Sequence, residues 1–315
     1  MKILVVGGAG YIGGYLTDLL SKEGYDVTVL DSLVYESRYL KKVQFIRADI
    51  TDYNTVLPIL NNYDAVVWLA ALVGDGACAV NPNLSQITNF ETVKRVVDSY
   101  NGLIIFTSTC SVYGVNHDLI DENSPTKPLS VYAETKLGAE RYIVNILPSD
   151  RYLVFRLGTL YGLGDEFSRI RLDLVANLLT YLASTGKTLT VNGGEQWRPL
   201  LHVKDVSHAI LFGLKRNIRG LYNLSNKNYN IKDIAEEIRL AIPEVVINYV
   251  PMKTEDLRDY RVKNDKILAT GWFPTLELKD GIKEIIDVFR ESRIVNPEDP
   301  IYNNHVFLKQ AYAIR

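Results

Sequence analysis

The chain has 315 residues, of which 47% are hydrophobic, so it can bury a large core and does not have the composition of a disordered chain. Its 35 basic and 37 acidic residues are interspersed and give a formal net charge of −2, which argues against nucleic acid or an anionic membrane and favours a small-molecule partner. Cys78 and Cys110 form neither a redox pair nor a metal cluster, and no apolar run is long enough to span a membrane. We therefore expect a soluble, cytoplasmic protein without a bound metal.

Short β-branched runs alternate with amphipathic stretches through the first half of the chain. The expected strands are residues 3–6, 27–30, 45–48, 65–69, 103–106 and 153–157. The expected helices between them are residues 11–23, 53–62, 84–100 and 132–147. This alternation predicts an α/β fold, a Rossmann-type doubly wound parallel sheet with helices on both faces.

The rhythm changes after about residue 158. The expected helices there are residues 170–185, 204–215, 231–241 and 279–290, separated by short strands and turns. We expect a first domain over residues 1–158 and a smaller mixed α/β lobe over 159–315, with about 200–228 returning to the first domain. The last twenty or so residues carry too weak a pattern to assign.

Three glycines separate the first expected strand from the first helix. Gly7, Gly10 and Gly13 suit a sharp turn in which the backbone approaches a pyrophosphate at the helix N-terminus, although a purely structural turn is the alternative. Asp31 ends the second strand, 18 residues after Gly13, where a carboxylate can accept hydrogen bonds from both adenosine-ribose hydroxyls. The same carboxylate would repel the extra phosphate of NADP, so the order of elements predicts an NAD-binding first domain and a substrate-binding lobe.

Two later strand ends extend this cofactor site. Asp49 and Ile50 are expected to contact the adenine, although Asp49 also suits a cap for the helix that begins near residue 53. Ala70 and Ala71 offer small side chains beside the pyrophosphate, or serve packing. The cofactor contacts predicted on strand ends and in the glycine turn are Gly7, Gly10, Tyr11, Ile12, Gly13, Asp31, Asp49, Ile50, Ala70 and Ala71.

A hydroxyl, a phenol and an amine follow the fifth strand. Thr109 lies at the strand end, and Tyr132 and Lys136 share one face of the next expected helix. Tyr249 and Lys253 have the same spacing, but Pro251 between them excludes helical facing. Context therefore favours the first pair, because the carboxyl edge of such a sheet forms the ligand crevice.

The chemistry explains why these residue types are needed. A phenol with a pKa near 10 is a poor base at neutral pH unless a nearby ammonium and the cationic nicotinamide stabilise its phenolate. Lys136 would supply that charge and hydrogen-bond the nicotinamide ribose. Thr109 would orient the substrate hydroxyl, or would be a strand-end threonine bonded to backbone.

At this point the chain resembles the extended short-chain dehydrogenase/reductases, especially nucleotide-sugar enzymes of the UDP-glucose 4-epimerase type. The likeness covers nearly the whole chain and rests on the glycine turn at residues 7–13, Thr109 four residues before Tyr113-Gly114, Tyr132 with Lys136, and residues 192–205, which read Asn-Gly-Gly-Glu-Gln-Trp-Arg-Pro-Leu-Leu-His-Val-Lys-Asp. The resemblance implies that Tyr132 is the general base and Thr109 binds the reacting hydroxyl. It also implies that Arg198 and Arg258 contact the nucleotide diphosphate and that Asn89 lies near the nicotinamide.

Several positions depart from relatives with other chemistry. Cys110 and Ser111 stand where dehydratases of the family place Asp-Glu, so dehydration is disfavoured. Fucose-synthase-like enzymes use a cysteine at the position of Ser111, and we interpret Cys110 as a buried packing residue. Val73 and Thr159 replace a lysine and an asparagine found in epimerases, which leaves the substrate pose open.

A second, looser likeness links residues 169–174 with Asn177, and residues 258–260, to nucleotide-sugar C4 dehydrogenases and reductases. It makes Asn177 a candidate substrate contact. His202, between apolar neighbours, is expected to be a core histidine and not a catalyst.

The leading hypothesis is an NAD-dependent epimerase that acts on a nucleotide-diphosphate sugar by reversible hydride transfer at C4. The alternative is a C4 dehydrogenase or 4-ketoreductase, and a 4,6-dehydratase or a non-catalytic NAD-binding sensor is disfavoured. The family resemblance also implies a homodimer that pairs the helices at 84–100 and 132–147, although periodicity cannot separate such a face from core.

Overall fold

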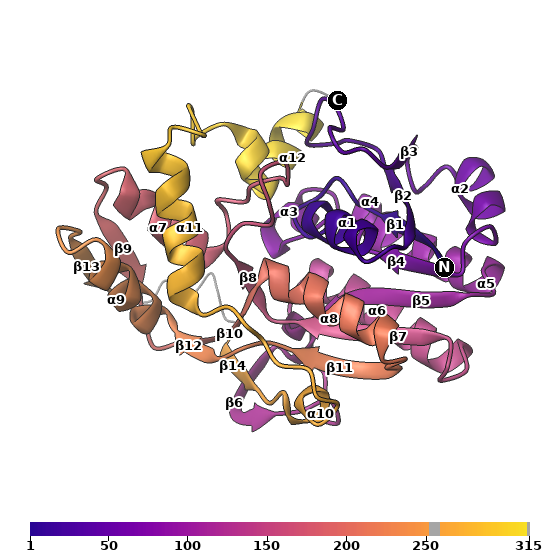
Figure 1. Ribbon diagram of the computed structural model, residues 1–315. Coiled ribbons are helices and arrows are strands. Elements are labelled where there is room, and N and C mark those ends of the chain that lie inside the picture. Colours follow the sequence, from indigo (N-terminus) through magenta and orange to yellow (C-terminus); the bar gives the residue numbers. More distant parts are fainter. Residues whose placement is uncertain (252–258, 314–315) are drawn as a thin grey trace.

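The computed structural model describes residues 1–251 and 259–313, and its largest element is a parallel seven-stranded sheet in the order β11-β7-β5-β4-β1-β2-β3 (Figure 1). Its strands are β1 (Lys2–Val6), β2 (Asp26–Asp31), β3 (Gln44–Arg47), β4 (Ala65–Trp68), β5 (Leu103–Thr109), β7 (Tyr152–Leu157) and β11 (Gly220–Leu224). All six strands expected in the first half are present. Strand β5 runs on to Thr109, so this residue lies at the carboxyl edge of the sheet.

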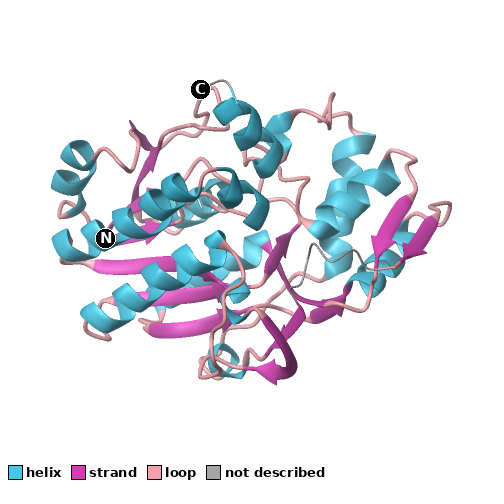
Figure 2. Ribbon diagram, turned by 180° about the vertical axis from the view of Figure 1, so that it is seen from behind, coloured by secondary structure: helices cyan, strands magenta, loops and turns pink. Residues whose placement is uncertain are grey.

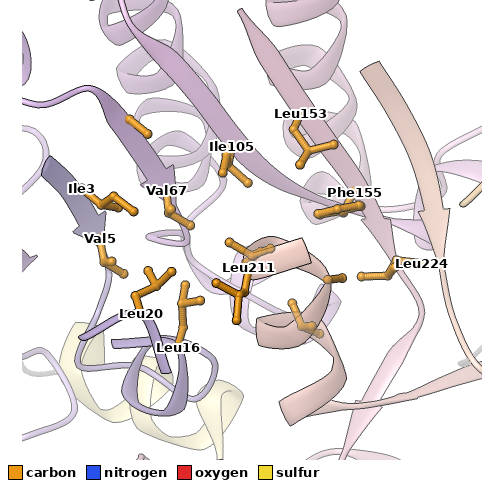
Figure 3. Packing of buried hydrophobic residues seen from close by; sticks show 14 of the residues in the cluster. Ile3, Val5, Leu16, Leu20, Val67, Ile105, Leu153, Phe155, Leu211 and Leu224 are labelled. Atoms are coloured by element: carbon orange, nitrogen blue, oxygen red, sulfur yellow. The ribbon is translucent and has the colours of Figure 1, made fainter. Parts of the chain in front are cut away.

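Helices cover both faces of this sheet, which confirms the doubly wound α/β fold. One face carries α1 (Gly13–Lys22) and α8 (Val203–Lys215), and the other carries α2 (Tyr53–Leu60), α5 (Thr92–Ser99) and α6 (Val131–Ile146). Figure 3 shows the first of these two cores, in which side chains of α1 and α8 meet the apolar strand residues. The labelled residues are Ile3, Val5, Leu16, Leu20, Val67, Ile105, Leu153, Phe155, Leu211 and Leu224. Strands buried on both faces explain why their sequences are apolar runs without alternation.

Outside the large sheet, the described chain forms small sheets and three longer helices (Figure 2). Strands β8 (Thr159–Tyr161), β10 (Trp197–His202) and β12 (Asn228–Asn230) form one sheet, β9 (Leu189–Asn192) pairs with β13 (Ile247–Val250), and β6 (Val115–Ile120) pairs with β14 (Asp259–Val262). The three helices are α7 (Val175–Ser184), α9 (Ile231–Ala241) and α11 (Leu278–Arg290). Within residues 200–228, β11 belongs to the large sheet and α8 packs against it, whereas β10 belongs to a small sheet. The division into an NAD-binding and a substrate-binding part stays a prediction.

Short helices complete the chain, and some of them differ from expectation. They are α3 (Asp75–Val80), α4 (Pro82–Gln86), the π-helical turn η1 (Ile87–Glu91), the 3-10 turns η2 (Cys110–Tyr113) and η3 (Pro300–Tyr302), α10 (Asp265–Leu268) and α12 (Asn304–Ala313). The helix expected over 84–100 is thus interrupted by a π turn. The helix expected over 170–185 begins only at Val175, because its N-cap Leu174 has an extended backbone and residues 162–173 form bends and loops.

The C-terminal helix α12 is absent from the sequence-based expectations. It packs against α3 and lies beside it in Figure 1. Among its described residues only Asn304 and Leu308 are buried, so the helix has no continuous apolar face that the sequence could have shown. Its position depends on its contacts with the rest of the chain. No helix in the described ranges has the length and apolar character needed to cross a membrane.

Candidate functional site

A cavity of about 390 Å³ opens at the carboxyl edge of the large sheet, where the ligand crevice of such folds lies. Most of the predicted residues form its wall. Those that line it are Gly7, Gly10, Tyr11, Ile12, Gly13, Asp31, Asp49, Ile50, Ala70, Ala71, Thr109, Tyr132 and Lys136. Residues far apart in the sequence are therefore brought to one surface by the parallel strands.

The glycine turn has no room for side chains. A Cβ on Gly7, whose φ is +82°, would lie 2.6 Å from the backbone nitrogen of Ala70, and one on Gly13 would lie 2.5 Å from the Cα of Gly8. No side chain caps the N-terminus of α1, and of its first amides that of Gly14 donates to the Gly10 carbonyl at 3.2 Å. This open, uncapped helix end fits a pyrophosphate.

Asp31 is held at the end of β2 by two backbone donors. Its Oδ2 accepts from the amide of Ala9 at 3.0 Å, and its Oδ1 accepts from the amide of Leu33 at 2.8 Å. Burial raises the pKa of this carboxyl, whereas the amides of Leu33 and Ala9 oppose that rise. Each oxygen retains a lone pair that can accept a ribose hydroxyl.

Replacing Asp31 by alanine should weaken NAD binding by roughly 10- to 100-fold, because two charge-assisted hydrogen bonds to the ribose would be lost. Discrimination against NADP should shrink, since the repelling carboxylate is gone. Titration of NADH and NADPH fluorescence measures both effects. Asp26→Ala, at the exposed start of the same strand, is the matched control. Unchanged affinity for both cofactors would reject the ribose assignment.

Asp49 does not cap a helix, which corrects the alternative considered for it. Its Oδ1 accepts from the backbone and hydroxyl of Thr51 at 2.8 and 2.7 Å. Asp52 is the N-cap of α2 and accepts from the amide of Thr55. Asp49 lines the cavity beside Ile50, where an adenine contact stays a prediction.

Thr109, Tyr132 and Lys136 meet at the β5 end of the cavity. Helix α6 begins after Ser130, whose hydroxyl accepts from the amide of Ala133 at 3.2 Å and thereby fixes the first turn. The side chains of Tyr132 and Thr109 both line the cavity here, and the Thr109 hydroxyl accepts from the amide of Ser111 at 3.1 Å. One turn later, the Lys136 ammonium lies 4.1 Å from the centroid of the Phe106 ring.

Burial acts on both titrating groups of this cluster. It raises the pKa of Tyr132 far above its usual value, and the positive charge of Arg171 and the neighbouring Thr109 side chain oppose this rise. It lowers the pKa of Lys136, which is 2% exposed, to about 7. Within the described ranges the Lys136 ammonium has no hydrogen-bond acceptor. The Lys136 amine is therefore available to a ligand. Because its pKa is close to neutral, a nearby ligand can readily change its protonation state.

A buried ion pair supports the cluster from below. Glu140, one turn after Lys136 on α6, pairs with Arg156 of β7 at 2.6 Å and accepts from the hydroxyl of Ser108 at 2.6 Å. Arg156 also donates to the Tyr113 hydroxyl at 2.7 Å. These contacts tie α6 to β5 and β7, and losing one partner would leave an uncompensated buried charge.

Asn89 lies behind the cavity wall and not in it. Its Oδ1 accepts from the amide of Leu72 at 2.8 Å, and its Nδ2 donates to the Leu72 carbonyl at 2.9 Å. Both ends of the side chain amide thus hold the loop after β4, in which Leu72 lines the cavity. Asn89 therefore supports this loop, and its expected position near the nicotinamide stays a prediction.

Asn177 is also outside the wall. Its Oδ1 accepts from the amide of Gly162 at 2.9 Å, and its Nδ2 donates to the Arg171 carbonyl at 2.8 Å and to the Tyr11 hydroxyl at 3.3 Å. The amide is fully used and the residue is 1% exposed. In this structure Asn177 therefore positions Tyr11 and Arg171, and its expected direct contact with substrate is not seen.

The two arginines expected at the diphosphate have different outcomes. Arg198 is buried on β10, where it donates to the Trp197 carbonyl at 2.8 Å and has further interactions within the chain. It does not line the cavity. Arg258 lies outside the described residues, as does Lys253. Both diphosphate contacts stay predictions.

Two negative expectations are confirmed. Cys110 is fully buried and donates from Sγ to the Arg156 carbonyl at 3.2 Å, as expected of a packing residue. His202 is fully buried, and its Nδ1 accepts from the amide of Lys204 at 3.2 Å. Its Nε2 must then carry the proton that it donates to Glu284 at 2.8 Å. His202 is therefore a satisfied core histidine.

Several other residues line the cavity. Tyr35 and, on α12, Asn304, Leu308 and Tyr312 were not predicted, whereas Arg169, Arg171 and Tyr260 lie in segments that the sequence linked only loosely to C4 dehydrogenases and reductases. No sequence signal pointed to α12. Across the described ranges, no three His, Cys, Asp or Glu side chains form a metal-binding group.

Comparison with known proteins gives the family. A sequence profile described as NAD dependent epimerase/dehydratase family matches residues 3–231. A putative UDP-glucose 4-epimerase of Methanocaldococcus jannaschii is 28% identical, with 90% of this chain and 97% of that protein covered. The human dTDP-D-glucose 4,6-dehydratase is 27% identical, with 92% and 90% covered.

A solved structure extends the likeness to three dimensions. The UDP-glucuronic acid 4-epimerase of Bacillus cereus, crystallised with UDP-glucuronic acid and NAD, is 27% identical and superposes with a TM-score of 0.78 over 93% of this chain and 100% of that one. The chain belongs to the NAD-dependent epimerase/dehydratase family, within the extended short-chain dehydrogenase/reductases. The resemblance is confirmed, and NAD is the cofactor of this nucleotide-sugar enzyme.

Proposed function

We propose that the protein is an NAD-dependent epimerase that inverts C4 of a nucleotide-diphosphate sugar. The observation that carries this proposal is the cluster at the β5 end of the cavity, where the Tyr132 phenol and the Thr109 hydroxyl line the wall together with a buried amine one helical turn from the phenol. These three groups suffice for the removal and return of a hydroxyl proton. Bound NAD would accept the hydride from C4 and return it.

In this mechanism Tyr132 is the general base and Thr109 orients the reacting hydroxyl. The phenolate oxygen takes the 4-hydroxyl proton as the C4–H bond breaks, and the threonine hydroxyl shares the developing charge on oxygen. Lys136 would place its ammonium near the phenolate and would be available to hold the nicotinamide ribose of bound NAD. After the 4-ketone has turned its other face, Tyr132 returns the proton.

The position of the carboxylates supports hydride transfer over dehydration. The carboxylates that line the cavity within the described ranges are Asp31, Glu36 and Asp49. They follow β2 and β3, and β2 is separated from β5 by three strand spacings, roughly 14 Å. An acid and base for elimination at C5 and C6 would have to lie beside Thr109, where Ser111 supplies a hydroxyl to the wall.

The relatives support a UDP-sugar as the first substrate to test. Incubation with UDP-glucose, UDP-galactose and their N-acetyl analogues, followed by NMR of the products, should show interconversion at C4 without net change in NAD. Because the cofactor has to stay bound between the two half-reactions, purified protein should carry NAD(H). Stoichiometric accumulation of NADH together with a released 4-keto product would contradict epimerisation.

A C4 dehydrogenase or 4-ketoreductase is the second candidate. It is favoured by the likeness of residues 169–174 to such enzymes, and Arg169 and Arg171 of this segment line the cavity. The same product assay separates the two, since only the alternative consumes or produces NADH in each turnover. A homodimer through α5 and α6 also stays a prediction, for which sedimentation is the test.

A further inference from the structure

Two arginines of one segment without helix or strand structure form a wall of the cavity near the glycine turn. Arg169 and Arg171 are 7% and 8% exposed and both line the cavity. The segment lies over the start of α1, because a Cβ on Gly14 would meet the Ser168 side chain at 2.2 Å. Two guanidinium groups are thus buried close to the uncapped helix end described above.

The charges of these two arginines are unequally compensated. Arg171 forms a two-point ion pair with Asp173, at 3.0 Å from Nε and 2.9 Å from Nη2. Arg169 donates from Nε and Nη2 to the carbonyl of Ile301, at 3.2 and 2.7 Å, and stacks 3.6 Å above the Tyr35 ring. Asp173 and Glu36 also interact electrostatically with Arg169, but neither forms an ion pair with it among the described residues, so the guanidinium lacks a direct anionic partner.

Among the described residues no carboxylate lies within ion-pair distance of Arg169. Burial, and then the positive charge of Arg171, lower the pKa of Arg169 to about 10. A buried charge is normally paired, because removing it from water is costly. An anionic ligand in the cavity would supply the missing partner, and a phosphate group matches the planar fork of a guanidinium.

The segment before and at the start of α12 fixes this arrangement. The Ile301 carbonyl holds Arg169 directly, and the Asn304 amide donates to Asp173 at 3.1 Å, on the carboxylate that pairs with Arg171. Asn304 also donates from Nδ2 to the Val73 carbonyl at 2.7 Å. Both guanidinium groups are therefore preorganised by contacts outside the glycine turn.

The neighbours of the two arginines indicate which part of the cofactor they face. Arg169 stacks on Tyr35, in the loop that follows Asp31 at the expected adenosine end. Arg171 interacts electrostatically with Tyr11 in the glycine turn and with Tyr132 at the expected nicotinamide end. The pyrophosphate of NAD joins these two ends.

We propose that Arg169, with Arg171 beside it, binds the pyrophosphate of NAD from the side opposite the amides of α1. The site then holds the diphosphate between a helix N-terminus and a guanidinium wall supported by residues 301–304. This inference rests on NAD as the cofactor and not on the reaction at C4. Its test contains no sugar turnover, so failure of the proposed epimerisation would leave it standing.

The test is the affinity of Arg169→Gln for ligands with and without the pyrophosphate, measured by calorimetry on cofactor-free protein. The dissociation constants for NADH and ADP-ribose should rise roughly 10- to 100-fold, and more at low than at high salt. The affinities for adenosine and for UDP-glucose should change less than about threefold. Arg293→Gln is the matched control, since Arg293 also donates to a carbonyl, that of Glu166 at 3.1 Å, but is exposed.

Arg169→Lys keeps the charge and loses the fork, and it should weaken ADP-ribose binding about tenfold. It also serves if the glutamine variant does not fold, as judged by circular dichroism. Unchanged ADP-ribose affinity in a folded variant would overturn the proposal. An equal loss for adenosine would also overturn it, because that result indicates general distortion, and so would a loss confined to UDP-glucose, which would assign Arg169 to the substrate.

Discussion

Replacing Tyr132 by phenylalanine should lower kcat for nucleotide-sugar turnover by roughly 10²- to 10⁴-fold, whereas NAD affinity should fall by less than about tenfold. The reason is that the phenol oxygen is the proton acceptor in the proposed step, while the ring and its packing remain. Thr109 would keep its hydrogen bond with the amide of Ser111, at 3.1 Å, so the local backbone is not disturbed. The measurement is product formation by NMR together with NADH titration.

Tyr249→Phe is the matched control for this variant. Tyr249 also has a lysine four residues after it, but its hydroxyl is on the surface and donates to Glu236 at 2.6 Å. Its loss should leave kcat unchanged. If the Tyr132 variant turned over within about twofold of the unchanged protein, Tyr132 could not be the general base.

Replacing Lys136 by methionine should cost at least about 100-fold in kcat at pH 7 and move the acid limb of the pH profile to higher pH. Burial already raises the pKa of Tyr132, so its phenolate depends on a neighbouring positive charge. The pKa shifts of Tyr132 and Lys136 give the direction of this change in the pH profile. The pKa of Lys136 is lowered to about 7, so in cofactor-free protein the ammonium is lost as pH rises through that value.

With methionine at position 136 the phenolate forms only at higher pH, and part of the activity should return there. Measuring kcat from pH 6 to 10 tests this shift, which a merely structural lysine would not produce. Lys266→Met is the matched control, because Lys266 also lies over an aromatic ring, that of Tyr222 at 4.8 Å, but is exposed. An unshifted profile in the Lys136 variant would contradict the role of its charge.

The parts of the site predicted from sequence are those that local geometry determines. The glycine turn directly follows β1 and runs into α1. Its position at the carboxyl edge of the sheet therefore follows from the order of residues in the chain. Tyr132 and Lys136 are four residues apart on one helix, and Thr109 ends the preceding central strand. Periodicity and strand order were enough to bring these residues together.

The parts of the site that the sequence did not determine depend on side-chain direction and on partners that are distant in sequence. Asn177 is on a helix that begins five residues later than expected, and its amide turns toward Tyr11 instead of the cavity. Arg198 lies in a small sheet whose partners are distant in sequence. The contacts of Arg169 come from residue 301, which no local pattern connects to it. The spacing of residues in the sequence does not predict such contacts between distant segments.

The hydrogen bonds of Asn304 also bear on how the chain acquires its cofactor. They join residues 73, 173 and 304, so this wall closes only after segments separated by 231 residues have met. A chain emerging from the ribosome forms its N-terminal strands first. The glycine turn is therefore built early, whereas the guanidinium wall is completed late. Tight retention of the dinucleotide would then report that the whole chain, and not only its sheet, has reached the folded state.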